Sequence, residues 1–134
     1  MKALLLENIH PDGVRLLTER GISVESVSGA LDEAELAAAL PGVQLLGIRS
    51  KTTVSRTVFD GAPDLLAVGA FCIGTNQVDL AAAAERGTVV FNAPFSNTRS
   101  VVELVIAEII ALARRLTDKN ACLLYTSPSP RDRS

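Results

Sequence analysis

The sequence has little of several residues on which common functions depend. It contains no tryptophan, one histidine and two cysteines among 134 residues. Cys72 and Cys122 are too few for a disulfide framework, and no group of residues has metal-ligand spacing, so we expect no metal. No apolar run reaches the length of a membrane span. Residues 1–6 are followed at once by polar Glu7 and Asn8, unlike a secretory signal. We therefore expect a soluble, cytoplasmic protein.

Charge of either sign is also sparse. The chain has thirteen Lys and Arg residues and fifteen Asp and Glu residues, which gives a net charge of -2. The cations are scattered, whereas binding to nucleic acid or to an anionic membrane needs a basic stripe. We expect neither partner. Hydrophobic residues make up 48% of the chain, enough for the core of one compact domain.

Short apolar runs alternate with helical patterns along most of the chain. The strands expected are 3–6, 22–27, 45–48, 65–68 and 89–91, and the helices are 14–20, 34–40, 54–59, 78–86 and 101–116. Repeated strand–helix units predict an α/β fold, a parallel sheet with helices on both faces. Five such strands fit the flavodoxin-like order 2-1-3-4-5. The last helix is apolar on most sides, so we expect it to cross to another domain.

Local signals place several helix ends. Gly after Arg ends two helices, at Gly21 and Gly87, because glycine accepts the left-handed conformation. The side chains expected to begin helices are Asp32 with Glu35, Asn76, and Ser100 with Glu103.

Three polar loops follow strands at the carboxyl edge, where ligands bind in open parallel sheets. They span residues 49–52, 69–76 and 92–100. Arg49 and Arg99 suit a small anion, and Gly69 and Gly74 allow backbone N–H groups to approach a ligand. The alternative is that both arginines are surface charges paired with acids.

Two further polar residues near this edge have plainer interpretations. We expect His10, in the loop after the first strand, to be a solvated histidine. We expect Cys72 to be a half-buried, inert thiol.

The strings at residues 48–52, 71–80 and 91–101 resemble the D-isomer-specific 2-hydroxyacid dehydrogenases. The last two resemble the bacterial D-3-phosphoglycerate dehydrogenases of that family in particular, and the likeness covers residues 1–121. The resemblance implies a flavodoxin-like substrate domain, an inserted Rossmann domain that binds NAD, and a homo-oligomer. It also implies oxidation of 3-phosphoglycerate to 3-phosphohydroxypyruvate, the first step of serine biosynthesis.

The resemblance assigns substrate binding to Arg49, Ser50, Lys51, Ile73, Gly74 and Asn97. The first three would contact the charged ends of the substrate, the backbone of the next two its carboxylate, and the amide would lie beside the substrate and the nicotinamide. Arg99 would be structural. Lys51 and Ser28 depart from the pattern, because many bacterial members have Arg and Lys there, and they weaken the case for a phosphorylated substrate.

On this basis we expect a substrate-binding domain over residues 1–99, an interdomain helix over 100–121 and a tail over 122–134. The tail has no helical or strand period, and it contains Pro128 and Pro130. Residues 122–132 are also what a transposase-type sequencing-library adapter encodes. We expect the tail to be non-native, with a disordered natural terminus as the alternative.

The family's NAD fingerprint and its catalytic Arg, Glu and His would follow residue 121. We therefore expect a fragment without catalytic residues and without the NAD-binding domain, inactive on its own. A related 2-hydroxyacid or 2-ketoacid reductase fragment remains an alternative, as does a free-standing flavodoxin-like module that binds small anions. Residues 7–12 resemble neither the aspartate cluster of a receiver domain nor a flavodoxin phosphate loop.

Overall fold

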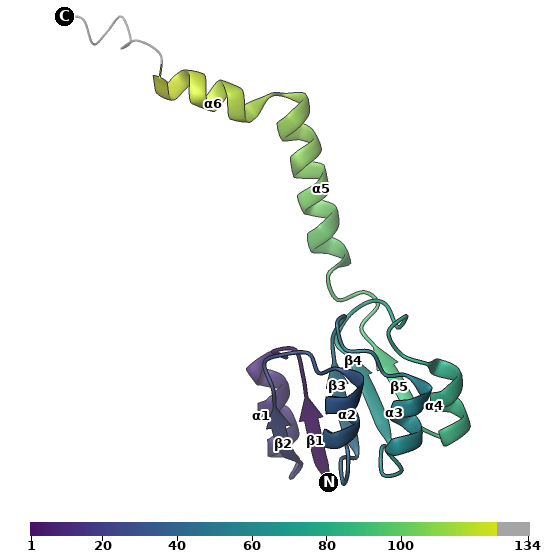
Figure 1. Cartoon of the computed structure of the whole chain (residues 1–134). Helices are drawn as coiled ribbons and strands as arrows, with labels where there is room; N and C mark the ends of the chain where they lie inside the picture. The colour runs from purple at the N-terminus through teal and green to yellow at the C-terminus, as the bar shows by residue number, and fades with distance from the viewer. Residues whose placement is uncertain (126–134) are drawn as a thin grey trace, which may run out of the picture. The chain divides into compact units, whose positions relative to one another are not determined.

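The computed structural model describes residues 1–125, and the chain divides into two compact units, Met1–Ser96 and Asn97–Ser134. The first unit contains one sheet and four helices (Figure 1). Its strands are β1 (Lys2–Leu5), β2 (Ser23–Ser26), β3 (Leu45–Ile48), β4 (Ala67–Ala70) and β5 (Val89–Asn92). Its helices are α1 (Pro11–Glu19), α2 (Glu33–Ala39), α3 (Arg56–Gly61) and α4 (Leu80–Arg86).

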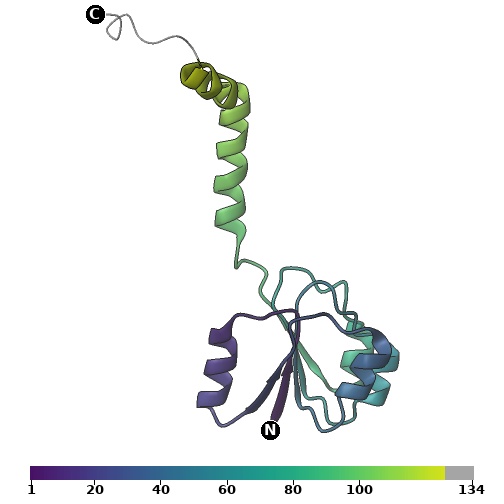
Figure 2. The same ribbon diagram turned by 60° about the vertical axis from the view of Figure 1, so that its left-hand side comes forward.

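The sheet has the order β2-β1-β3-β4-β5, and every pair of neighbouring strands is parallel. Helix α1 lies on one face, and α2, α3 and α4 lie on the other (Figure 2). This confirms the predicted flavodoxin-like arrangement. The strand order reverses between β1 and β3, so the loops that follow these two strands diverge at the carboxyl edge and leave space for a ligand.

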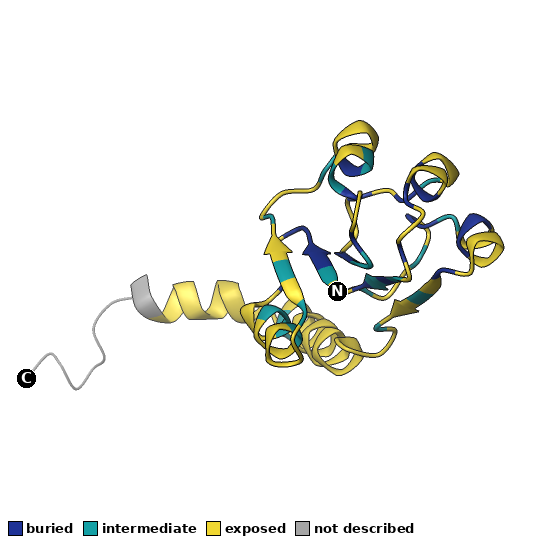
Figure 3. Cartoon of the chain, turned by 90° about the horizontal axis from the view of Figure 1, so that it is seen from below, coloured by how far each residue is buried: buried dark blue, intermediate teal, exposed yellow. Residues whose placement is uncertain are grey.

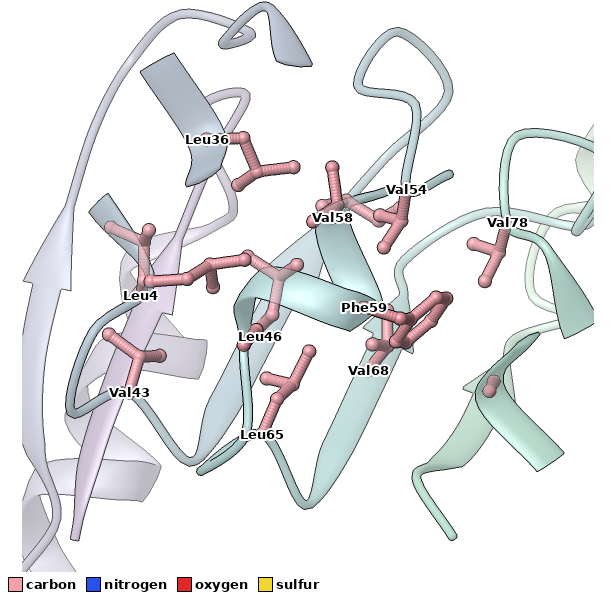
Figure 4. Packing of buried hydrophobic residues seen from close by; sticks show 14 of the residues in the cluster. Leu4, Leu36, Val43, Leu46, Val54, Val58, Phe59, Leu65, Val68 and Val78 are labelled. Atoms are coloured by element: carbon pink, nitrogen blue, oxygen red, sulfur yellow. The ribbon is translucent and has the colours of Figure 1, made fainter. Parts of the chain in front are cut away.

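The core lies between the sheet and helices α2 to α4. Leu4, Leu46 and Val68 are neighbours in register across three strands, and Phe59 of α3 belongs to the same buried cluster (Figure 4). Burial of each such side chain contributes about 1.5–3 kcal/mol. Buried positions concentrate on the inner strands and the inward helix faces (Figure 3). This face of the sheet therefore holds the loops at its carboxyl edge on a rigid base.

Several predicted helix ends are present. The side chain of Asp32 accepts a hydrogen bond from the Glu35 N–H at 2.8 Å, and the Glu35 carboxylate accepts one from the Asp32 N–H at 3.0 Å. Gly21 and Gly87 have φ angles of +75° and +71°. Both the first capping box and the two glycine stops are thus confirmed.

The start of α4 differs from the prediction, because Asp79 rather than Asn76 caps it. The Asp79 side chain accepts from the Ala82 N–H at 2.9 Å. Val54 and Val78 form a parallel bridge, which keeps residues around each of them out of helical conformation. The same bridge explains why α3 begins at Arg56, two residues later than predicted.

The position of β4 also differs, since the predicted strand 65–68 lies two residues before the observed one. The Leu65 N–H donates to the carbonyl of Ala62 at 3.2 Å, so Leu65 belongs to a turn. Gly69 and Ala70 instead pair with Gly47 and Ile48 of β3. Long-range pairing, which a local pattern does not contain, decided the register.

The second unit contains α5 (Thr98–Ala113) and α6 (Leu116–Tyr125) in place of the single helix expected over 100–121. Arg115, with a φ of +50°, separates them, because the left-handed conformation ends a right-handed helix. The predicted capping box of Ser100 and Glu103 is wrong, since Asn97 is the N-cap residue and Glu103 instead accepts from the Arg99 side chain.

Helix α5 buries none of its side chains. Residues 122–125 of the expected tail belong to α6, and the rest of that tail lies outside the described residues. Across residues 1–125, no helix is both long enough and apolar enough to cross a membrane.

Candidate functional site

The loops after β1, β2 and β3 meet around a cavity of about 320 Å³ at the carboxyl edge of the sheet. Three residues predicted to bind substrate, Arg49, Ser50 and Lys51, line it together. The remaining lining residues are Glu7, Asn8, Ser28, Gly29 and Ala30. Ser28, which stands where many bacterial members of the resembled group have a lysine, therefore lines the same cavity as the predicted anion-binding residues.

A second cavity, of about 430 Å³, lies beside the first and shares Arg49 and Asn8 with it. His10 lines this cavity, but its side chain is 79% exposed. Its Nδ1 atom accepts a hydrogen bond from the Asp12 N–H at 3.2 Å, which makes it the N-cap of α1. His10 is thus the solvated loop histidine that the sequence indicated.

The carboxylate of Glu7 lies beneath the 49–52 loop and is almost wholly buried. It accepts hydrogen bonds from the N–H groups of Arg49 at 3.0 Å, Lys51 at 3.0 Å and Thr52 at 2.9 Å. Sequence reasoning missed this residue, because Glu7 is 42 to 45 positions away from its partners. The one available signal was a charged residue directly after a buried strand.

Burial raises the pKa of the Glu7 carboxyl, and hydrogen bonds from Thr52, Lys51 and Arg49 lower it by more. The resulting pKa lies below the ordinary value for glutamate, so the side chain is a carboxylate at neutral pH. The Thr52 hydroxyl adds to this lowering. The oxygen of this hydroxyl is fully buried, and it forms no hydrogen bond of ordinary length and angle within the described part of the chain.

The turn that carries Glu7 is strained. Glu7 and Asn8 have φ angles of +60° and +55°, a left-handed conformation that costs a non-glycine residue about 1 kcal/mol or more. The Glu7 N–H donates to the carbonyl of Gly29 at 3.0 Å, and the Asn8 N–H donates to that of Val27. These bonds tie the loop after β1 to the loop after β2 and help to hold the turn.

The loop after β4 presents two backbone donors. Among residues 1–125, the N–H groups of Ile73 and Gly74 donate to no other group. Their carbonyls are used, since Ile73 accepts from the Asn92 side chain at 2.7 Å and Gly74 accepts from the Cys72 thiol at 3.2 Å. Both N–H groups are therefore available to a ligand, and their predicted role of holding a carboxylate stays a prediction.

Gln77 and Cys72 connect the loops after β3 and β4. The Gln77 amide donates to the Arg49 carbonyl at 2.7 Å and to the Gly74 carbonyl at 3.4 Å. The Cys72 thiol contacts the same two carbonyls and is half-buried, as expected. Gln77 is buried and was not singled out from the sequence. Together these two side chains hold Arg49 at a set position relative to Gly74.

Gly69 lies close to an aromatic side chain. It lies within β4, and a Cβ atom there would be 3.3 Å from the Phe71 ring. The same ring lies 3.2 Å from the position of a Cβ on Gly47. These two glycines therefore make room for an aromatic side chain, and the approach of a ligand to Gly69 stays a prediction.

Arg49 and Arg99, the two arginines that the sequence suggested for anion binding, differ in their ion pairing. Arg99 pairs with Glu103 one turn along α5, and its side chain is 91% exposed, which fits a surface charge. Arg49 and Lys51 form no ion pair among residues 1–125. Both retain an unpaired positive charge beside the cavity, so they are the cations available to an anion.

Asn97 belongs to the second unit, where it precedes α5 and is exposed. Its carbonyl accepts a hydrogen bond from the Val101 N–H at 3.0 Å. The structure therefore brings together the predicted residues of the 49–52 loop, places Ile73 and Gly74 in a loop connected to it, and has Asn97 in a separate unit.

The turn after β1 does not fit NAD. A dinucleotide fold binds pyrophosphate at a Gly-rich turn after its first strand. Here that turn is Glu7-Asn8-Ile9-His10, which contains no glycine and carries a buried carboxylate. Within the described ranges, no three His, Cys, Asp or Glu side chains gather as a metal site would need.

A family model described as D-isomer specific 2-hydroxyacid dehydrogenase, catalytic domain, matches residues 3–128. The chain belongs to this family. The D-3-phosphoglycerate dehydrogenase of Dictyostelium discoideum is 50% identical over 120 residues, which cover 90% of this chain and 30% of that protein. D-3-phosphoglycerate dehydrogenase 1 of Saccharomyces cerevisiae is 52% identical, with 90% and 26% covered. The enzyme of Escherichia coli K12 is 48% identical, with 90% and 30% covered.

Solved structures show the same fold. A protein from Thermus thermophilus superposes with a TM-score of 0.82 at 29% identity, over 97% of this chain and 43% of that one. The apo D-lactate dehydrogenase of Escherichia coli superposes with a TM-score of 0.70 at 25% identity, over 90% of this chain and 40% of that one. The chain thus spans less than a third of the curated 2-hydroxyacid dehydrogenases described above.

Proposed function

We propose that this chain is the substrate-binding part of an NAD-dependent D-3-phosphoglycerate dehydrogenase. The whole enzyme would oxidise 3-phosphoglycerate to 3-phosphohydroxypyruvate in cytoplasmic serine biosynthesis, as a homo-oligomer. The observation that carries the proposal is the cavity lined by Arg49, Ser50 and Lys51, whose two cations form no ion pair among residues 1–125. Identities near 50% with enzymes of that name support the same substrate.

The chemistry of the cavity suits a substrate with two anionic ends. The guanidinium of Arg49 can bind two oxygens of a carboxylate or phosphate at once. Lys51 adds a second positive charge, the Ser50 hydroxyl adds a donor, and the free N–H groups of Ile73 and Gly74 supply two more. The role of Asn97 beside the substrate stays a prediction from the resemblance.

We expect no turnover from this chain alone. The reaction removes a proton from a hydroxyl group, and His10, the only histidine, already serves as a helix cap. The turn after β1 is also unsuited to NAD, which would accept the hydride in the whole enzyme. Steady NADH formation from 3-phosphoglycerate by the purified 134-residue chain would contradict this expectation.

Substrate binding can be tested without activity. Titration of the ¹⁵N-labelled chain with 3-phosphoglycerate should shift the amide signals of the 49–52 and 71–76 loops. Arg49→Ala should weaken binding about tenfold or more, since a charge-assisted hydrogen bond contributes about 1.5–3 kcal/mol. Arg99→Ala, which removes a paired and exposed arginine, is the matched control and should leave the affinity unchanged. Equal affinities for all three proteins would refute the assignment.

A related reductase acting on an unphosphorylated 2-hydroxy or 2-keto acid is the second candidate. Ser28 and Lys51 favour it, because both line the cavity and offer less to a phosphate than the Lys and Arg expected there. D-lactate and 3-phosphoglycerate, titrated in parallel, separate the two. Tighter binding of 3-phosphoglycerate supports the first proposal, and equal or tighter binding of D-lactate supports the second.

A further inference from the structure

The 49–52 loop is built around an anion that the chain itself provides. Three of its four N–H groups, those of Arg49, Lys51 and Thr52, converge on the Glu7 carboxylate at 2.9–3.0 Å. Successive backbone N–H groups arranged in this way form the kind of concave site that binds external anions in other proteins. Here the anion is internal and almost wholly buried.

This arrangement separates the roles of backbone and side chain within one loop. Because Glu7 takes three backbone donors, the side chains of Arg49 and Lys51 are what these residues can offer to a ligand. The N–H of Ser50 donates to no group among residues 1–125. The Glu7 hydrogen bonds also hold the backbone from which both cationic side chains extend.

We propose that Glu7 is a positioning residue for anion binding, acting through the 49–52 loop on Arg49 and Lys51. The inference rests on the proposed substrate-binding function. Two effects of the carboxylate oppose each other. Its negative charge beside the cavity disfavours an anionic ligand, whereas its hydrogen bonds organise the cations that bind that ligand. The proposal states that the second effect is larger.

Because the two effects differ in sign, a neutral variant distinguishes them. Glu7→Gln keeps the size of the side chain but removes the charge and replaces one acceptor with an NH₂ group that faces backbone donors. Coulomb repulsion alone predicts tighter binding of 3-phosphoglycerate by this variant. Positioning predicts binding about tenfold weaker or more. Glu19→Gln, at an exposed carboxylate on α1, is the matched control and should change little.

Chemical rescue provides a second readout. Glu7→Ala empties the space beneath the loop, and acetate in millimolar amounts should enter it and restore part of the lost affinity. In wild type, acetate should compete only weakly with 3-phosphoglycerate. A general loss of folding would not respond to acetate in this way. If Glu7→Ala does not fold, Glu7→Gln and Glu7→Asp carry the test, with the shorter, charged variant retaining more affinity than the neutral one.

Wild type and every variant would be made as the 134-residue chain. Inorganic phosphate would serve as a second ligand. Amide hydrogen exchange of residues 49, 51 and 52 would be measured in the same proteins. Weaker binding with faster exchange in Glu7→Gln supports the proposal. Binding by Glu7→Gln as tight as wild type, or tighter, overturns it and leaves the substrate-binding function standing. If wild type binds neither 3-phosphoglycerate nor phosphate, the proposed function fails, and the positioning role fails with it.

Discussion

At position 7, burial and hydrogen bonding act on one carboxyl group in opposite directions. Removal from water raises its pKa, and three backbone donors with a nearby hydroxyl lower it further than burial raises it. The group remains charged in an environment where an unpartnered carboxylate would be costly. The left-handed φ angles of Glu7 and Asn8 add strain to the same turn. These costs are concentrated beside the cavity, as is common at functional sites.

Stability should depend on pH through Glu7. Its folded pKa lies below its unfolded value of about 4.5, so its contribution is fully present above that pH and is lost as pH falls through the folded pKa. We expect Glu7→Gln to lower the free energy of unfolding by about 2 kcal/mol at pH 7. The difference from wild type should shrink below pH 4.5. Urea unfolding at pH 3 to 7 measures this, and a difference independent of pH would contradict it.

At the scale of elements, the helix ends show which boundaries are set by local sequence signals alone. Gly87 ends α4 with a φ of +71°, and Asp32 with Glu35 begins α2, as their sequences indicate. The predicted cap at Asn76 is wrong because the Val54–Val78 bridge keeps the chain non-helical as far as Asp79. Local capping chemistry therefore holds where no long-range pairing competes for the same backbone.

A pair of glycine substitutions tests whether the left-handed conformation at Gly87 requires glycine. Gly87→Ala should destabilise the fold by about 1 kcal/mol, because its left-handed conformation is unfavourable for alanine. Gly61, at the end of α3, has no positive φ, and a Cβ there meets nothing within 4 Å. Gly61→Ala should therefore be neutral or stabilising by up to about 1 kcal/mol. Thermal unfolding of both variants checks the prediction, which equal effects would contradict.

At the scale of the molecule, the two units differ in burial. Every residue of the buried core cluster lies in the first unit. Helix α5 is rich in apolar residues yet buries none of them. Its exposed apolar side chains are Val101, Val102, Leu104, Val105, Ile106, Ile109, Ile110 and Leu112. A helix of this composition normally packs against a partner.

We expect residues 1–96 to fold without the second unit. The core cluster is retained, so the midpoint of thermal unfolding should lie within roughly 4 °C of that of the whole chain, a shift that about 1 kcal/mol would produce. Circular dichroism of both chains measures this. Analytical ultracentrifugation should also show that the shorter chain self-associates less. Loss of cooperative unfolding in residues 1–96 would show that the second unit is needed for folding.

Local patterns were sufficient for much of the architecture. Alternating apolar runs and helical periods predicted five strands, their parallel order and four helices of the first unit, because burial of apolar faces dictates both period and layering. The strings around residues 48–52 and 71–80 also indicated the family and the candidate loops for an anion, and the family model confirms the family. Arg49, Ser50 and Lys51 were found together because adjacent residues share a loop wherever that loop lies.

Tertiary structure alone decided the rest. It placed β4 two residues later through its pairing with β3, and it divided the long helix at Arg115. It brought Glu7 under the 49–52 loop and Gln77 between the two loops, although 42 and 28 residues separate these side chains from Arg49. The sequence by itself therefore determined which segments are strands, helices and charged loops. Which buried side chain holds each loop depends on hydrogen bonds between distant residues, and those exist only once the sheet has formed.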